Sequence, residues 1–338
     1  NVPPYPSTGD PVRITSGNLD FRQRDIYIPC PGIPLEFARA YNSIPTRENP
    51  LGQGWNHTYS WKLIDLTEIQ GDTNVHWKVV IGADGREYRF RVLDEDETEF
   101  GHCSENRWRL STWGSGYELS MPGDIDYHFT SAGLLERIHD GWSNSVTLSY
   151  DGTRLTNALH SNGLGLKFSY NGAGHLVGVE TPDPNLSVSF GVDGSGSITS
   201  AVRNAGSAST TNQYSYIGTV LTQRTNPRGE VIDYGVDGRK ATNSTVGGYY
   251  AVALENVSAA QTAVKSSPRG LNITTDYKFH AGNRRVTEVD GPRLSSSTNP
   301  AVRGSRYQHD FFGNITNQVD FDAGVNESNL IYRRYGHF

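Results

Sequence analysis

One short phrase recurs in the middle of the chain at a step of twenty residues. "LSYDGTRL" (148–155) is followed by "FSYNGAGHL" (168–176), which places Tyr150 and Tyr170 twenty residues apart. Apolar and polar residues alternate up to each tyrosine, which is the period of a strand with one buried face. The Asp-Gly or Asn-Gly that follows accepts the positive φ angles of a tight hairpin turn. Each phrase therefore predicts a strand, a tight turn and the start of an antiparallel partner strand.

The same phrase continues on both sides of this pair, with looser spacing toward the C-terminus. The aromatic residues that mark its units are Tyr127, Tyr150, Tyr170, Phe190, Tyr234, Tyr277 and Tyr307. Self-similarity at this period is typical of repeat architectures, in which each unit buries its apolar face against its neighbours. We therefore expect an all-β fold of repeated antiparallel hairpins that form one curved, spiralling sheet. Tyr150, Tyr170, Phe190 and Tyr234 should project from one face of it.

The composition agrees with a β-rich chain. Of the 338 residues 37 are Gly, aromatic residues make up 11% and charged residues only 20%. Residues 249–264 are the one segment that fits a helical pattern, through Leu254, Val257, Gln261 and Val264; a strand through Tyr250 to Val257 competes with it, and we favour the strand. No apolar run approaches the ~20 residues that a membrane-spanning helix needs.

The first hundred residues lack the repeated phrase and have a different residue pattern. The segment "SGNLDFRQRDIYIPCPGIPLEFARAYNS" (16–43) predicts two alternating strands around a proline-rich break, and Arg39 interrupts the apolar face of the second. In "LGQGWNH" (51–57), Gly52 and Gly54 allow a sharp turn or a close backbone approach before Trp55. A further hairpin is predicted in "IGADGREYRF" (81–90).

In combination, "SGNLDF", "PGIPLEFARAYNS", "LGQGWNH" and "DGREYRF" resemble the opening region of the RHS proteins, and the later phrases resemble the YD repeats of that family. The resemblance implies an RHS-type N-terminal β region over 1–120 and a YD-repeat sheet over 121–338. It also implies a sheet that spirals into part of a hollow shell. Such shells enclose a C-terminal toxic segment in bacterial toxin systems, and related ones occur in toxin complexes of insect pathogens and in teneurin receptors.

The sequence is shorter than this family pattern, with about six or seven units and no visible core segment or toxin after Phe338. We expect a fragment of a longer protein or a short relative. The strands around 17–28 and 331–335 are then the expected sheet edges, which would pair with the chain's own continuation or with other copies. The expected function is a non-enzymatic, extracellular or cell-surface module for encapsulation or assembly, filaments included.

Little in the sequence indicates catalysis or a cofactor, and we predict no metal site. His57, His102, His128, His139 and His175 lie beside turns or within strand patterns, and no known catalytic or metal-binding spacing occurs. The best local candidate is "DIDYHF" (124–129) with Arg137 and His139. A polysaccharide lyase could use a Tyr or His base and an Arg of this kind on acidic sugars.

All six tryptophans precede residue 143, at positions 55, 61, 77, 108, 113 and 142. They favour one of two hypotheses. Trp55 and Trp61 could plug one end of the sheet's interior, or the cluster could stack on sugar rings in a carbohydrate-binding or adhesive protein. The net charge of −6 and the lack of a basic cluster argue against nucleic-acid binding. The acidic run "DEDETE" (94–99) is a solvated loop, a cation site or an electrostatic contact.

Two further features leave alternatives open. Cys30 and Cys103 can form a disulfide, worth about 4 kcal/mol for a loop of this length, or remain two buried thiols. Seven Asn-x-Ser/Thr triplets are glycan acceptors in a secreted eukaryotic protein, or chance products of a turn-rich composition. They lie at Asn56, Asn185, Asn243, Asn256, Asn272, Asn314 and Asn326.

Overall fold

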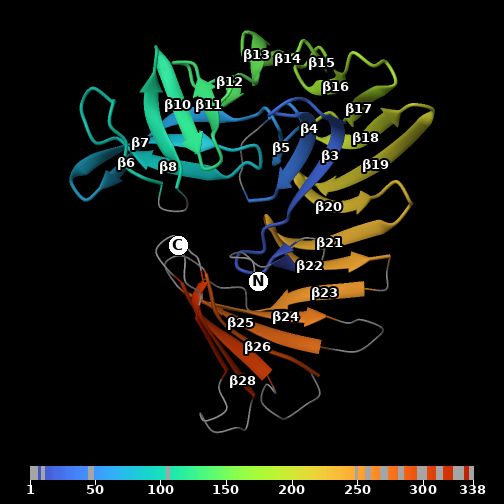
Figure 1. Ribbon diagram of the computed structural model, residues 1–338. Coiled ribbons are helices and arrows are strands. Elements are labelled where there is room, and N and C mark those ends of the chain that lie inside the picture. Colours follow the sequence, from blue (N-terminus) through green and yellow to red (C-terminus); the bar gives the residue numbers. More distant parts are fainter. Residues whose placement is uncertain are drawn as a thin grey trace. The chain divides into compact units, whose positions relative to one another are not determined.

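The computed structural model describes residues 7–8, 12–44, 49–103, 107–247, 250–255, 260–266, 273–280, 285–294, 303–309, 315–322 and 331–334. Every regular element in these ranges is a β-strand (Figure 1), which confirms the all-β prediction. The chain divides into two compact units, Phe21–Gln213 and Asn1–Asp20 with Tyr214–Phe338. The boundary expected at residue 120 lies inside a strand of the first of these units.

The unit Phe21–Gln213 contains two three-stranded sheets, ordered β3-β4-β5 and β6-β7-β8, and a hairpin sheet whose strands follow chain order from β9. The strands of the two small sheets are β3 (Asp20–Ile28), β4 (Leu35–Asn42), β5 (Trp55–His57), β6 (Lys62–Gln70), β7 (Thr73–Ile81) and β8 (Glu87–Arg91). Those of the hairpin sheet are β9 (Arg109–Trp113), β10 (Gly116–Met121), β11 (Ile125–Phe129), β12 (Leu135–Asp140), β13 (Ser145–Asp151), β14 (Arg154–His160), β15 (Gly165–Tyr170), β16 (Leu176–Glu180), β17 (Leu186–Val192), β18 (Ile198–Ala205) and β19 (Ala208–Ile217).

The unit formed by Asn1–Asp20 and Tyr214–Phe338 continues the hairpin pattern in chain order. Its strands are β1 (Ser7–Thr8), β2 (Val12–Arg13), β20 (Val220–Thr225), β21 (Val231–Asp237), β22 (Lys240–Val246), β23 (Tyr250–Glu255), β24 (Gln261–Ser266), β25 (Ile273–Phe279), β26 (Val286–Leu294), β27 (Arg303–His309), β28 (Ile315–Asp322) and β29 (Ile331–Arg334). The antiparallel pair β23–β24 shows strands rather than a helix in the described residues of this segment, Tyr250–Glu255 and 261–264.

The repeat aromatics all lie on odd-numbered strands of the hairpin sheet, namely β11, β13, β15, β17, β21, β25 and β27. Two of them make the same hydrogen bond: the Tyr150 hydroxyl donates to the Leu135 carbonyl at 2.7 Å, and the Tyr170 hydroxyl donates to the Leu155 carbonyl at 3.0 Å, fifteen residues back in both cases. Burial raises the pKa of both hydroxyls, that of Tyr170 to about 12, so they remain protonated donors. Each hydroxyl thus ties its hairpin to the preceding one.

The aromatic and Asx-Gly pattern does not mark two positions of the repeat. Tyr214 on β19 and Leu254 on β23 are buried, at 5% and 7% exposure, on the strands between the marked ones. Leu254 follows Tyr234 at the same step of twenty residues, but its unit lacks the aromatic ring and the Asx-Gly turn. The twenty-residue spacing from Tyr234 was the one sequence signal that could have located Leu254.

The turns are of two kinds, and only one matches the expectation. Gly152 and Gly238 have positive φ angles of 61° and 57° in two-residue turns, as predicted. After Asn171 and Asp193 the loop is longer, and the positive φ falls on Gly174 (89°) and Gly196 (86°). The prediction of tight Asn-Gly and Asp-Gly turns at 171–172 and 193–194 is therefore wrong.

The longer loops are shaped by the side chain of their first residue. Asn171 Oδ1 accepts the N–H groups of Ala173 and His175, and Asp193 Oδ1 accepts those of Ser195 and Ser197. Such side-chain bonds to the local backbone compete with a tight turn. Asn226 Oδ1 holds a third loop of this form by accepting the N–H groups of Arg228 and Glu230.

A register shift recurs near the turn end of these hairpins. It lies between Ser149 and Tyr150, Ser169 and Tyr170, Gly191 and Val192, and Gly235 and Val236. An extra residue on one strand bends that strand and increases its twist. The repeated shift therefore gives a physical reason for curvature in the hairpin sheet.

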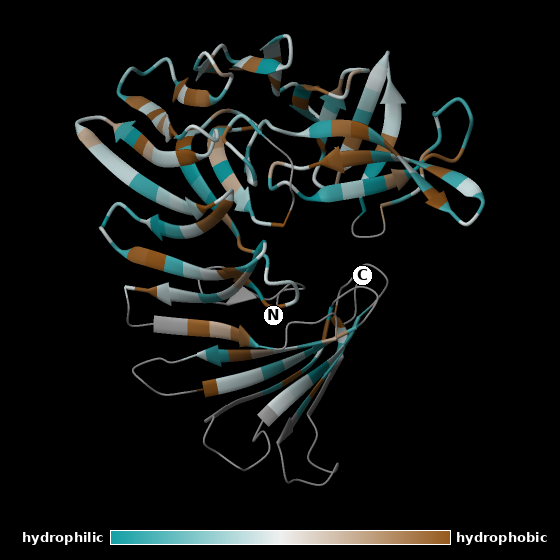
Figure 2. Ribbon diagram, turned by 180° about the vertical axis from the view of Figure 1, so that it is seen from behind, coloured by the Kyte–Doolittle hydropathy of each residue, from teal (hydrophilic) through white to brown (hydrophobic). Residues whose placement is uncertain are grey.

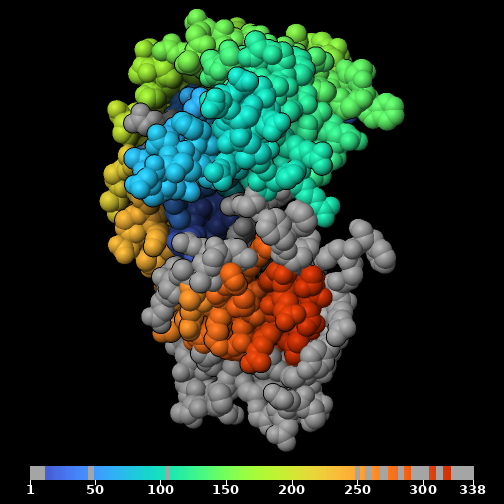
Figure 3. All heavy atoms as spheres, turned by 90° about the vertical axis from the view of Figure 1, so that its left-hand side faces the viewer, coloured from blue at the N-terminus to red at the C-terminus, as the bar shows by residue number. Residues whose placement is uncertain are grey.

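Within Phe21–Gln213 the N-terminal strands pack on the apolar face of the hairpin sheet. The Phe37 ring lies 5.9 Å from that of Phe168 and 6.1 Å from that of Phe190, and the Leu176 N–H donates to the Pro50 carbonyl. Apolar and polar bands alternate along the strands in Figure 2. Figure 3 shows residues of β6–β8 at the surface beside those of β9–β11. Every residue of β4 except the half-buried Glu36 is buried, so both faces of this strand are covered.

Replacing Tyr150 or Tyr170 by Phe should lower the free energy of unfolding by about 1 kcal/mol each, since a backbone carbonyl loses its donor while the ring stays packed. Tyr27→Phe, at a side chain that is 45% exposed, should change it by less than about 0.5 kcal/mol. Urea denaturation of the three variants measures this. Equal effects at all three positions would contradict a structural role for the repeated hydroxyl.

Candidate functional site

Arg39 is buried at the centre of the unit Phe21–Gln213. Its side chain has no exposed surface, and it donates to Asp25 from Nε at 2.5 Å and from a terminal nitrogen at 3.0 Å. The guanidinium also lies over the rings of Trp55 and Phe190, at 5.5 and 5.4 Å. The Asp25 carbonyl accepts the Nε–H of Arg203 at 2.6 Å. The residue that interrupts the apolar pattern of its strand is thus neutralised inside the core.

The glycines before Trp55 serve close backbone approaches, as the sequence indicated. Gly52 has a φ of 99°, and a Cβ there would lie 2.7 Å from the Ser197 Cα. A Cβ on Gly54 would lie 2.8 Å from the Asn42 carbonyl oxygen. These contacts seat Trp55 in the core, where its ring is fully buried beside those of Phe21 and Tyr41.

Removing one partner of the Arg39–Asp25 pair should be costly. Asp25→Asn leaves a buried guanidinium without its counter-charge and should lower the free energy of unfolding by about 3–5 kcal/mol. Glu68→Gln, which breaks the exposed pair with Arg89, should lower it by less than about 1 kcal/mol. Denaturant unfolding compares the two. A similar small loss in both variants would contradict the central position of the buried pair.

His57 lies in the same core, between the rings of Phe37 and Phe168 at 5.4 and 6.0 Å. Its Nδ1 accepts the N–H of Tyr59 at 3.2 Å, so the neutral ring carries its proton on Nε2. Burial lowers the pKa of His57 to about 4 from the ordinary 6.5. The ring is a packed, neutral element of the core.

This shift predicts a pH dependence of stability. Above pH 6.5 the ring is neutral in both states, whereas between pH 6.5 and about 4 only the unfolded chain takes up the proton, so stability falls as the pH falls. The loss across this window should be about 3 kcal/mol. His57→Asn, which keeps an acceptor, should remove that part of the slope, and His76→Asn at an exposed histidine should not. Denaturation series at pH 7 and pH 4.5 test this, and identical slopes in wild type and His57→Asn would refute it.

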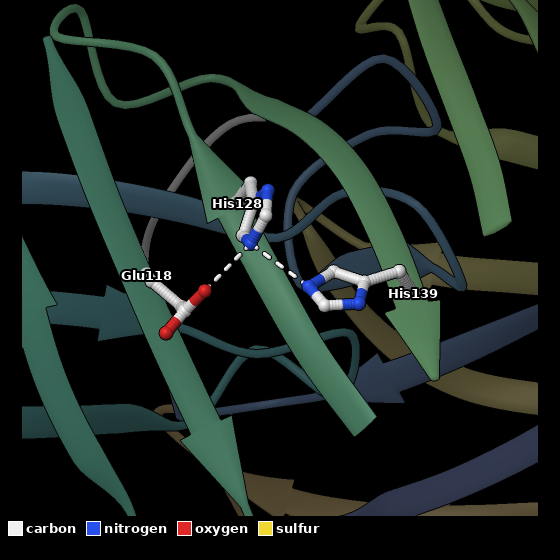
Figure 4. Close-up of side chains that lie close together, drawn as sticks. All are labelled: Glu118, His128 and His139. Carbon is white, nitrogen blue, oxygen red and sulfur yellow. Dashed lines mark hydrogen bonds and ion pairs between the residues drawn. The ribbon is translucent and has the colours of Figure 1, made fainter. Parts of the chain in front are cut away.

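A second group of polar side chains lies on the opposite face of the hairpin sheet, on β10, β11 and β12 (Figure 4). Glu118 pairs in register with His128, and Asp126 pairs with His139. His128 Nε2 lies 2.7 Å from a carboxylate oxygen of Glu118 and 3.0 Å from His139 Nε2. The three side chains therefore converge on one point.

The neighbours of this outward cluster fix its two rings. His139 Nδ1 donates to the Asp140 carbonyl at 2.9 Å, which leaves its Nε2 lone pair facing the cluster when the ring is neutral. The His128 ring stacks on Trp113, with centroids 3.8 Å apart, and its side chain is only 4% exposed. Burial lowers the pKa of His128; the hydrogen bond that His128 makes to Glu118 opposes this, and the charges of His139 and Arg137 add to the lowering.

The lyase candidate is only partly assembled. Asp126, His128, Arg137 and His139 share the outward face through the strand register, whereas Tyr127 projects to the other face and packs on Trp61 at 4.5 Å. A Tyr base and these histidines therefore do not face one substrate. Glu118, which sequence reasoning missed, enters only because β10 pairs with β11 in this register.

An aromatic cavity of about 330 Å³ lies on the Tyr127 side. Rings of Trp61, Tyr88, Trp108 and Tyr127 line it together with Arg22 and Asp84. Trp61 therefore belongs to this cavity, and Trp55 to the buried core. The tryptophans expected to act together are divided between two places.

The remaining sequence candidates do not converge. Cys30 and Cys103 are both free thiols; Cys103 is buried, whereas Cys30 is half-buried. In the acidic run, Glu97 contacts the Lys78 ammonium at 2.6 Å, and Asp94 accepts backbone N–H groups of Thr98 and Glu99. Part of the run is thus an electrostatic contact. His102 lines a separate cavity with Phe100 and Arg109, and His175 follows the loop held by Asn171, so neither belongs to the cluster.

The candidate glycan acceptors divide into three groups. Asn56 is 3% exposed in β5, and because an oligosaccharide cannot be accommodated in a packed core, this position favours the chance alternative. Asn185 and Asn243 are exposed. The remaining four, Asn256, Asn272, Asn314 and Asn326, lie outside the described residues.

Comparisons with known proteins find a family match over part of the chain. Residues 9–90 match the model of a domain of unknown function, DUF6531, and no curated protein matches the chain. In the described part of the chain no helix is long and apolar enough to cross a membrane.

Solved structures of toxin complexes show similarity at low identity. They include crystal structures of TcdB2-TccC3-TEV (10% identity, TM-score 0.35) and TcdB2-TccC3-Cdc42 (11%, 0.37), and the Tc holotoxin pore of Photorhabdus luminescens with a TccC3 variant (11%, 0.32). The matches cover 84%, 86% and 90% of this chain but only 18%, 18% and 22% of those chains. The chain thus spans about a fifth of the length of these structures.

Proposed function

We propose that this chain is a non-enzymatic structural module, a wall segment of an RHS or YD-repeat shell that acts outside the cytoplasm in encapsulation or surface assembly. The observation that carries the proposal is the packing of the N-terminal strands on the apolar face of the repeated hairpins. Phe37 lies against Phe168 and Phe190, and Arg39 and Asp25 form a buried ion pair in the same core. This arrangement holds a sheet in shape and builds no reactive cleft among these residues.

The repeat geometry supports a wall that can be extended. Each hairpin pairs with its neighbours in chain order, and the Tyr150 and Tyr170 hydroxyls each bond to the preceding hairpin. Units that depend mainly on adjacent units can be added without changing those already present. The expected edge strands, β3 and β29, are then the places where a continuation of the chain or another copy would pair.

Assembly through the last strand can be tested by light scattering. Ile331 and Tyr332 pair with Asp320 and Val319 on β28. Proline at both positions removes strand N–H donors, so the Ile331→Pro/Tyr332→Pro variant should lose any assemblies that the wild type forms at high concentration. Ile217→Ser, which removes an apolar side chain that is 70% exposed, should keep them. A wild type that stays monomeric at every concentration would contradict pairing between copies.

A second candidate function is carbohydrate binding, which the aromatic cavity favours. Trp61, Trp108 and Tyr127 can stack on sugar rings while Arg22 and Asp84 bond to hydroxyls. Binding on a glycan array that Trp108→Ala abolishes and Trp142→Ala preserves would favour this function, because Trp142 is 88% exposed and remote from the cavity lining. Release of unsaturated sugars from a uronate polymer would contradict the non-enzymatic proposal.

A further inference from the structure

We propose that Glu118, His128 and His139 form a binding site for a divalent transition-metal ion of the Zn²⁺ class on the outward face of β10–β12. The site is separate from the buried core, and it stands whether or not the chain serves as a shell wall. It combines two imidazoles and one carboxylate, each from a different strand of one sheet.

The ligand atoms already lie at nearly the required separations. All three fall within 4.8 Å of one another, with 2.7 Å between Glu118 Oε2 and His128 Nε2 and 3.0 Å between the two Nε2 atoms. A tetrahedral Zn²⁺ centre with bonds of about 2.0–2.1 Å places its ligand atoms roughly 3.3 Å apart. The two short separations must therefore widen by about 0.3–0.6 Å, and the separation between Glu118 and His139, at most 4.8 Å, must come to the same length. Glu118 and His139 have the freedom to make these adjustments because each side chain is 25% exposed.

The balance of hydrogen-bond donors and acceptors among Glu118, His128 and His139 favours a bound cation. His139 Nδ1 donates its N–H to the Asp140 carbonyl, so when the ring is neutral its Nε2 lone pair faces His128 Nε2. The Glu118 carboxylate faces the same atom with negative charge. A single N–H on His128 Nε2 would have to serve two acceptors at once. A divalent cation would be bound by both acceptors and by the His128 lone pair together.

The surroundings resemble those of a metal site in two respects. The hydrogen bond from His139 Nδ1 to a backbone carbonyl fixes the tautomer and orientation of a ligand ring, as in many zinc centres. The Asp140 side chain is itself held, since it accepts the N–H groups of Trp142, Ser143 and Asn144. Stacking on Trp113 fixes the second ring.

The donor set selects the class of ion. Imidazole nitrogens with a carboxylate suit Zn²⁺ and its first-row neighbours, whereas Ca²⁺ and Mg²⁺ prefer oxygen ligands alone. Asp126 Oδ2, 3.7 Å from His139 Nε2, or a water molecule would complete four-coordination. His128 Nδ1 has no hydrogen-bond partner among the described residues, so we expect moderate affinity rather than that of a closed structural site.

Metal titration of the whole chain tests the proposal. Protein stripped with a chelator and carrying Cys30→Ser, which removes a competing thiol, is titrated with Zn²⁺ by calorimetry and with Co²⁺ by visible absorption. We expect one ion per chain and a four-coordinate Co²⁺ spectrum. Glu118→Gln and His139→Gln should each weaken binding about tenfold or more, and His76→Gln, at an exposed histidine outside the cluster, should leave it unchanged.

Three results would overturn the proposal: no saturable binding by the parent protein, unchanged affinity in both cluster variants, or equal loss in His76→Gln. Circular dichroism of each variant shows whether the strands persist. If His128→Gln fails to fold, the half-exposed positions Glu118 and His139 still decide the outcome, because their side chains contribute little to the apolar core.

Discussion

The buried ion pair between Arg39 and Asp25 is the interaction on which the packing of the unit Phe21–Gln213 depends. A guanidinium without exposed surface is tolerated only with a counter-charge and well-aligned donors. Asp25 provides these from β3, and the aromatic faces of Trp55 and Phe190 lie beside the cation. Because Phe190 belongs to the hairpin sheet and Trp55 to the N-terminal strands, the pair specifies how the two layers meet.

The hairpin sheet itself is built from local rules. Alternating side chains bury one face, a bulge near each turn bends the strand, and a tyrosine hydroxyl reaches back to a carbonyl of the preceding hairpin. None of these devices depends on a distant residue. A sheet of this kind can lengthen by repetition, and the N-terminal strands then supply the non-local contacts that a single hairpin lacks.

The period-2 pattern predicted the hairpins because side-chain alternation is a local property of a strand, as the segment 146–150 illustrates. Loop lengths after Asn171 and Asp193 were not predictable from the Asx-Gly dipeptide, since the same side chain stabilises a longer loop equally well. The partner of Arg39 and the burial of Asn56 depend on contacts remote in sequence.

The outward cluster of Glu118, His128 and His139 was likewise only partly predictable from the sequence. His128 and His139 belong to a segment that the sequence singled out, whereas Glu118 joins them only through the β10–β11 register. Alternation along one strand predicts which side chains share a face of the sheet. It does not predict which residue of the adjacent strand lies beside each of them. The separation of Tyr127 from the histidines, by contrast, follows directly from strand alternation.

Hydrogen exchange tests the central claim, that the N-terminal strands and the first hairpins form one cooperative core through the buried ion pair. Amide protection would be compared between the wild type and Asp25→Asn under native conditions. The account predicts that protection falls together in β4 and in β15–β17, because both layers contact the same charge and rings. Loss confined to β3–β5, with β15–β17 as protected as in the wild type, would contradict it.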